Sequence, residues 1–201
     1  MTVPTEKTLV IIKPDGVQRS LIGEIIKRYE QVGLKLIAIK MVIPTPEMAQ
    51  AHYMVGGEEW LTSVGEKAMA SYEKKGEKSP FATPRECGQA VLNRNARYMS
   101  AGPVVVMIWQ GNRAVPLVRK MTGGTEPLSS DVGTIRGDYT LDSYGLADVG
   151  ERSVRNLIHA SGEVHEAEKE IAIWFKPEEI LSYRLIADEI LYDINLDGIL
   201  E

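Results

Sequence analysis

The sequence predicts an α+β fold: a ferredoxin-like antiparallel sheet with helices on one face and an expanded helical hairpin. Short β-branched runs alternate with stretches in which apolar residues recur every three or four positions. In chain order the expected elements are strand, helix, strand, helices, strand, helix, strand and helix. That order contains two strand–helix–strand units with extra helices between them. A parallel, doubly wound sheet is the alternative.

The first strand, helix and second strand follow from local patterns. The run "TLVIIK" at 8–13 is rich in β-branched residues and stops at "PDG", which is typical of a strand entering a turn. Apolar residues from Leu21 to Val32 have helical spacing, and Gly33 is placed to end that helix. In "LKLIAIKMVI" lysines interrupt the apolar residues with the period of two that indicates a strand.

Threonine–proline pairs mark the starts of two later helices. Thr45 can cap a helix that begins at Pro46. Thr83 and Pro84 repeat the arrangement, and Glu86 follows where a capping box has its acid. The remaining chain predicts helices over 46–53, 58–75, 84–99, 113–121 and 163–174, strands over 103–109 and 133–140, and an irregular acidic tail.

Composition limits the class of protein. The 201 residues, 44% hydrophobic and 25% charged, can bury one core, so a single domain over 1–201 is expected. Apolar runs fall well short of the about 18 residues of a membrane span, and the start lacks a secretory signal, which together predict a cytoplasmic protein. A net charge of −5 argues against general binding to nucleic acid or anionic lipid. An anionic ligand therefore needs a local basic cluster.

Familiar phosphate and metal motifs are absent from the sequence. Neither G-x-x-x-x-G-K-[ST] nor G-x-G-x-x-G occurs, although 123–134 is rich in glycine and hydroxyl residues. The histidines at 52, 159 and 165 lack metal-ligand spacing, and Cys87 has no second cysteine to pair with, so we expect no zinc site. Four basic residues stand beside turn-like residues and are candidates for an anion site: Lys13, Arg119, Arg136 and Arg155.

His159 is the candidate for chemistry, and a satisfied core histidine is the alternative. It precedes the helix predicted over 163–174, for which Ser161 is a plausible cap. A helix N-terminus disfavours a cationic imidazolium, and a neutral imidazole is a competent nucleophile toward phosphorus. Glu170 can orient the ring only if the chain folds back. His165 lies on a charged helix face and is expected to have no catalytic role.

Several stretches together resemble the nucleoside diphosphate kinases. They are "TLVIIKPDGVQRSLIGEIIKRYEQVGLKLIAIKM", "HYMV", "YMSAGPVVVMIWQG", "GTIRGDY" and "RNLIHAS…EAEKEIAIWF", in the order that the family uses, and they cover most of the chain. The resemblance implies transfer of the terminal phosphoryl group from a nucleoside triphosphate to a nucleoside diphosphate through a phosphohistidine. It also implies Mg²⁺ on the nucleotide phosphates, a ferredoxin-like core and a homo-oligomer, either a hexamer or a tetramer.

The same resemblance suggests a catalytic group. His159 matches the phosphorylated histidine, Glu170 the acid that orients its ring, and Ser161 the hydroxyl beside it. Tyr53 matches a tyrosine packed beside the histidine. Lys13 matches a lysine close to both the sugar and the transferring phosphate.

Nucleotide-binding residues follow in the same way. Lys13 and Asn156 match the groups that contact the sugar hydroxyls, and Leu92 falls where the family usually has a phenylalanine against the base. Leucine offers apolar contact without aromatic stacking, so base affinity is expected to be weaker. The family's phosphate-holding set is matched by Arg119, Thr125 and Arg136.

Departures from the family pattern are as informative as the matches. Gly162 replaces an acidic residue, and insertions at about 56–88 and 141–153 enlarge the helical hairpin and the segment before "RNLIH". The insertions are expected to be a subunit contact, a lid over the nucleotide, or surface elaboration without a role. Three functions remain: an active kinase of broad base specificity, a nucleotide-binding regulator without turnover, and a carrier that passes phosphate from histidine to a protein.

Overall fold

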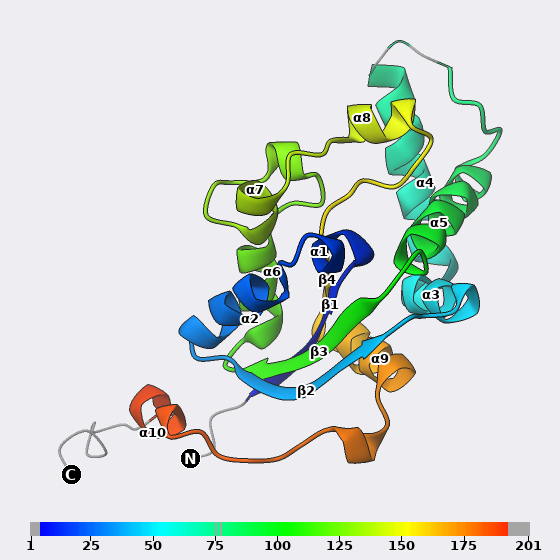
Figure 1. Cartoon of the computed structure of the whole chain (residues 1–201). Coiled ribbons are helices and arrows are strands. Elements are labelled where there is room, and N and C mark those ends of the chain that lie inside the picture. The colour runs from blue at the N-terminus through cyan, green and yellow to red at the C-terminus, as the bar shows by residue number, and fades with distance from the viewer. Residues whose placement is uncertain (1–4, 75, 77, 193–201) are drawn as a thin grey trace.

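The computed structural model describes residues 5–74, 76 and 78–192. Within them, one four-stranded antiparallel sheet has the order β2-β3-β1-β4 (Figure 1). Its strands are β1 (Glu6–Ile12), β2 (Lys35–Val42), β3 (Val104–Gly111) and β4 (Ile158–Ala160). The two central strands are not consecutive in the chain, and every pairing is antiparallel. The ferredoxin-like arrangement is therefore confirmed, and the parallel alternative is wrong.

The helices cover both faces of the sheet, where the sequence had suggested one. On β1, Val10 and Ile12 face a core that includes residues of α2 (Ile22–Gln31) and α6 (Ala114–Thr122). Leu9 and Ile11 face a second core with residues of α3 (Pro46–Tyr53), α5 (Pro84–Met99) and α9 (Val164–Trp174). The reason is visible in the burial of β1 and β3, which are enclosed on both sides. Strands of this kind read as continuous apolar runs and require a layer on each face.

Helix boundaries agree closely with the sequence patterns. Thr45 Oγ1 accepts a hydrogen bond from Met48 N, and Thr83 Oγ1 accepts one from Glu86 N, as expected of caps. The described helices are α1 (Pro14–Gln18), α2 (Ile22–Gln31), α3 (Pro46–Tyr53), α4 (Gly57–Lys74), α5 (Pro84–Met99), α6 (Ala114–Thr122), α7 (Ile135–Tyr139), α8 (Tyr144–Val149), α9 (Val164–Trp174) and α10 (Ala187–Tyr192).

Three local expectations were wrong. The stretch 133–140 forms the short helix α7 and not a strand, because Thr134 Oγ1 accepts from Gly137 N and caps it. Ser161 is not the cap of α9; Glu163 occupies that position, without a side-chain hydrogen bond. The acidic tail is not wholly irregular, since it contains α10, while 193–201 lie outside the described residues.

Candidate active site

His159 sits in the middle of β4, at the edge of the sheet. It is paired with Ile11 of β1, and its side chain is 19% exposed. Leu157, two residues earlier, has a φ of +63°, a left-handed conformation that is unusual for a branched residue. Its carbonyl oxygen accepts a hydrogen bond of 2.7 Å from Lys13 N. The sharp turn before β4 is thus fixed against the end of β1.

Glu170 reaches the His159 ring because α9 folds back along β1. Its Oε1 lies 3.0 Å from His159 Nε2, an ion-pair distance at an angle too oblique for a well-aligned hydrogen bond. Its Oε2 accepts a hydrogen bond of 2.6 Å from Ser161 Oγ, which also accepts one from Leu9 N. Burial alone would raise the pKa of Glu170, but His159 and Ser161 outweigh it and lower the pKa, so the carboxylate is ionised.

A second histidine, His52, completes this cluster and was missed in the sequence. Its ring meets that of His159 edge to face, with centroids 4.3 Å apart. Trp174 Nε1 donates to His52 Nδ1 at 3.3 Å, so the neutral ring carries its proton on Nε2. Burial, followed by the charge of His159, lowers the pKa of His52 well below its usual value. His52 is therefore a neutral residue beside the reactive candidate.

Tyr53 contributes a buried hydroxyl next to this pair. Its ring contacts His52 and stacks on Trp60, and burial raises its pKa. Among the described residues, its Oη has no hydrogen-bond partner. A buried hydroxyl without a partner is unfavourable unless a ligand or water satisfies it, so this atom points to a ligand site.

Lys13 and Asn156 form a hydrogen-bonded polar pair in the candidate site. Lys13 Nζ donates to Asn156 Oδ1 at 2.8 Å, while Asn156 Nδ2 donates to the Thr125 carbonyl at 2.9 Å. The lysine is 7% exposed. Burial, and then the charge of Arg136, lower the pKa of Lys13 to about 7. A lysine held in this way gains from a nearby anion, because the anion stabilises its charged form.

Arg136 is buried, and it organises the loop that follows α6. Its guanidinium donates to the carbonyls of Gly123, Gly124 and Ile158, and its Nε donates to the carbonyl of Asn156, which uses four of its five N–H groups. Burial lowers its pKa to about 10, which still leaves it charged at neutral pH. The arginine therefore joins the loop to β4 and keeps one donor for a ligand.

Arg119 supplies a second guanidinium on the exposed side. It lies in α6, and its Nη1 is 3.7 Å from the position that a Cβ on Gly162 would occupy. Gly162 N donates to Glu166 Oε2 at 3.1 Å, so α9 itself places an acid beside the position where the family pattern has one. Lys13, Arg119 and Arg136 thus gather local positive charge in a chain of net charge −5.

Comparison with known proteins decides the family. A family model described as nucleoside diphosphate kinase matches residues 6–60 and 59–180. A nucleoside diphosphate kinase from Pyrobaculum aerophilum is 48% identical over 183 residues, which cover 89% of this chain and 100% of that relative. This chain belongs to the nucleoside diphosphate kinase family.

Solved structures of nucleoside diphosphate kinases share its fold. The crystal structure of an NDP kinase from Pyrobaculum aerophilum has a TM-score of 0.86 at 46% identity, covering 89% of this chain and 100% of that one. A Borrelia burgdorferi nucleoside-diphosphate kinase, solved as a transition-state mimic with bound vanadate and ADP, has a TM-score of 0.78 at 34% identity. It covers 94% of this chain and 98% of its own.

Most residues suggested by the nucleoside diphosphate kinase pattern meet around His159, but Leu92 does not fit its expected part. Leu92 is 4% exposed on α5, so it has no free face to offer a base. Its neighbour Val91 is only half-buried, which shows that the phase of the helix turns Leu92 inward. The expectation of a leucine lid is not supported. Thr125 is present in the loop through its carbonyl contact with Asn156.

The side chains of this nucleoside diphosphate kinase chain can be compared with the ligands that Mg²⁺ requires. Within the described residues, one group of acidic and histidine side chains is close enough to share a metal: His52, His159 and Glu170. Mg²⁺ prefers oxygen ligands in octahedral geometry, and this group offers one carboxylate. The proton on His52 Nε2 also opposes metal binding there. The group of His52, His159 and Glu170 therefore does not fit a Mg²⁺ ion held by these three side chains.

Proposed function

We propose that this chain is an active nucleoside diphosphate kinase that carries the phosphoryl group on His159. The observation that supports this most strongly is the orientation of the imidazole. Nε2 faces the ionised Glu170, which leaves Nδ1 as the nitrogen free to react. The family membership and the transition-state mimic of a relative support the same reaction class.

In the first half-reaction, the Nδ1 lone pair attacks the γ-phosphorus of a nucleoside triphosphate. The bond from that phosphorus to the β,γ-bridging oxygen breaks, and the diphosphate leaves with the electron pair. The ring becomes cationic, and Glu170 stabilises the charge at Nε2, while Ser161 holds the carboxylate. A second diphosphate reverses these steps through its terminal oxygen and leaves the imidazole neutral.

The charged residues of the site would hold the phosphates. Lys13, Arg119 and the free donor of Arg136 supply positive charge and hydrogen bonds, with Thr125 beside them. Mg²⁺ on the nucleotide would neutralise part of the phosphate charge. The Tyr53 hydroxyl is available to the incoming phosphate, and the Lys13–Asn156 pair to the sugar hydroxyls. These contacts do not read base edges, so we expect broad base specificity.

We also infer a single domain over 1–201 that acts in the cytoplasm as a homo-oligomer, a hexamer or a tetramer. The edge strand β2 supports the oligomer, because Ile39, Met41 and the following Ile43 are 49%, 55% and 71% exposed. A row of exposed apolar side chains on a sheet edge is typical of a pairing surface. Among the described residues, no helix is both long and apolar enough to cross a bilayer.

The experiment that tests the proposal follows the phosphate through both half-reactions. The protein is incubated with labelled ATP and Mg²⁺, and an acid-labile, base-stable phosphoenzyme is isolated and given GDP. Label that moves to GTP supports the kinase. Label that stays on the protein would favour a phosphohistidine carrier, and absence of label would favour a nucleotide-binding regulator; either result contradicts the proposal.

A further inference from the structure

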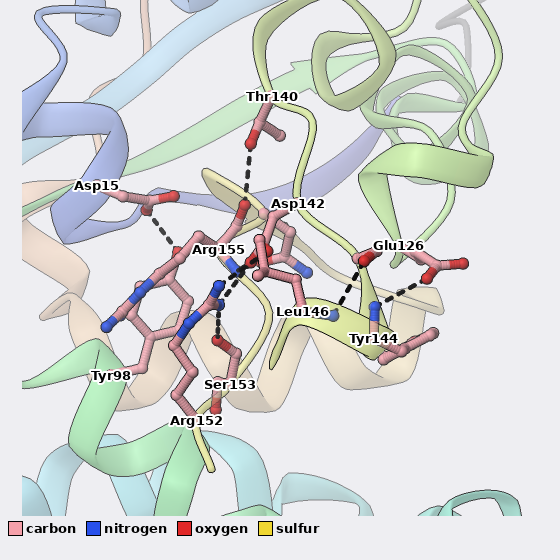
Figure 2. Close-up of polar contacts among 12 residues, drawn as sticks. Asp15, Tyr98, Glu126, Thr140, Asp142, Tyr144, Leu146, Arg152, Ser153 and Arg155 are labelled. Atoms are coloured by element: carbon pink, nitrogen blue, oxygen red, sulfur yellow. Dashed lines mark hydrogen bonds and ion pairs between the residues drawn. The ribbon is translucent and has the colours of Figure 1, made fainter. Parts of the chain in front are cut away.

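The insertion at 141–153 is fastened to both sides of the site. At its start, Tyr144 N donates to Glu126 Oε1 at 2.8 Å, in the loop that follows α6 (Figure 2). At its end, Ser153 Oγ donates to Asn95 Oδ1 at 2.7 Å, on α5. The insertion therefore bridges the loop and the helical hairpin, which is more than surface elaboration requires.

Asp142 is the centre of this insertion. It is 5% exposed, and its carboxylate receives two hydrogen bonds from the Arg152 guanidinium, at 2.6 and 2.9 Å. The same carboxylate accepts from the backbone N–H of Arg155 at 2.6 Å. The Arg152 guanidinium, with a further contribution from the Arg155 N–H, lowers the pKa of Asp142, so the acid is ionised. Figure 2 shows Asp142 and Arg152 face to face.

The hydrogen bond that Asp142 accepts from Arg155 N fixes the start of the turn that leads to β4. Other contacts fix the end of this turn. The Arg155 guanidinium lies over the ring of Tyr98, 4.5 Å from its centroid. Tyr98 Oη donates to one carboxylate oxygen of Asp15 at 2.5 Å, and the other oxygen accepts from Leu157 N at 3.1 Å. Between these two anchored N–H groups lies Asn156.

We propose that Asp142, clamped by Arg152, is a positioning residue for nucleotide binding. By holding the Arg155 N–H, it sets the backbone from which the Asn156 amide is directed toward Lys13 and a nucleotide sugar. This inference rests on the proposed sugar contact of Asn156. It gives the insertion a function within one subunit, in place of a subunit contact or a mobile lid.

Loss of the Asp142 contacts should change the position of Asn156 but not that of the His159 imidazole. His159 is held independently, by its pairing with Ile11 in the sheet and by Glu170 from α9. Loss of the Asp142 carboxylate should therefore weaken the use of donors that carry a ribose. A phosphoryl donor without a sugar should react with His159 as before. Merely structural damage would not separate the two donors.

The test compares phosphoenzyme formation from ATP with that from phosphoramidate, which transfers its phosphoryl group to Nδ1 and releases ammonia. In Asp142→Asn, we expect kcat/KM with ATP to fall about tenfold, as for loss of a charge-assisted hydrogen bond. The rate with phosphoramidate should stay within about twofold of the wild type. Equal losses with both donors, or no loss with ATP, would overturn the proposal.

Two further variants keep the result interpretable. Glu179→Gln is a matched control, because Glu179 likewise accepts from a cation, Lys40, and from a backbone N–H, that of Lys176. Glu179→Gln should form the phosphoenzyme from ATP and from phosphoramidate at the wild-type rates. A loss with ATP as large as that of Asp142→Asn would count against a specific role of Asp142. Arg152→Gln, at a partly exposed position, should reproduce the ATP-specific loss, and the double variant should be no worse than Asp142→Asn. Failure of the wild type to form any phosphoenzyme would instead refute the proposed function.

Discussion

The setting of the His159 imidazole is built by a near neighbour in the chain and by residues of two helices, α3 and α9. Glu170, which Ser161 holds by a hydrogen bond, lies against one side of the ring, and the neutral His52 packs against the ring from α3. In the proposed reaction, the contact with Glu170 matters most for transfer, because positive charge would appear on the ring only when Nδ1 accepts the phosphoryl group. A carboxylate that is already desolvated and ionised stabilises that charge without reorganisation.

Replacement of Glu170 by glutamine should therefore slow phosphoenzyme formation more than it weakens nucleotide binding. We expect a loss on the order of tenfold to a hundredfold in the single-turnover rate at saturating ATP, consistent with loss of one charge-assisted contact. Rapid quenching of the labelled enzyme measures it. Glu168→Gln, at an exposed position on the same helix, should have the wild-type rate. A wild-type rate in Glu170→Gln would show that the carboxylate is dispensable.

Lys13 makes a prediction about stability and pH in the absence of nucleotide. The pKa of its ammonium is about 7 in the folded chain, against an ordinary value of 10.5. Between these pH values the unfolded chain binds more protons than the folded chain. The contribution of Lys13 to the free energy of unfolding therefore increases as the pH rises. Below pH about 7 the ammonium is charged in both states, and the folded chain carries the full penalty of burying that charge.

The measurement is urea unfolding of the wild type and Lys13→Met at several pH values. The stability of the wild type relative to this variant should rise from pH 7 to 9, by up to about 1.4 kcal/mol per pH unit, and be level below pH 6. Lys120→Met, at an exposed site on α6, serves as the control and should show no such rise. A level or falling difference for Lys13→Met would contradict the burial of a charged lysine.

At the scale of elements, the α4–α5 hairpin depends on close approach of two helices. A Cβ on Gly88 would lie 2.0 Å from the Leu61 carbonyl oxygen, and one on Gly65 would lie 1.7 Å from that of Pro84. Both distances are far below van der Waals contact with backbone atoms, which cannot move aside easily. The glycines are therefore required where the helices touch.

Gly88→Ala should reduce the free energy of unfolding by about 1–3 kcal/mol, because the two helices must separate. Gly23→Ala is the matched control, because Gly23 also lies in a helix. Apart from its chain neighbours and the backbone of its own helix, no described atom lies within 4 Å of its added Cβ. That control should leave stability unchanged or raise it by up to about 1 kcal/mol. Thermal or urea unfolding of both variants gives the comparison. Equal stability of both variants would refute the close packing.

Elements with strong local signals could be predicted from the sequence, and those decided by tertiary contacts could not. The caps at Thr45 and Thr83 depend on neighbours three residues away, so their helices were predicted closely. The stretch 133–140 is an exception, because its Thr134 cap is also local, but the strand-like residues around it favoured the wrong prediction. His52 meets His159 only through the fold, because no sequence spacing relates residues on α3 and β4.

For the whole molecule, the exposed edge of β2 predicts self-association. Replacement of Ile39 and Met41 by glutamate should lower the mass in solution to that of a smaller assembly, because like charges would meet on a formerly apolar edge. Ile39→Val with Met41→Leu keeps the edge apolar and should keep the wild-type mass. Light scattering after size exclusion measures all three proteins. A monomeric wild type would contradict the expected oligomer.

The most direct measurement of the whole reaction is phosphoenzyme formation from ATP and Mg²⁺ in the wild type, His159→Ala and His165→Ala. Peptide mapping should place the acid-labile phosphate of the wild type on His159. We expect His159→Ala to form no phosphoenzyme, and His165→Ala, altered at an exposed position on α9, to behave nearly as the wild type. Equal loss in the two variants, or phosphate mapped to another residue, would contradict the central role of His159.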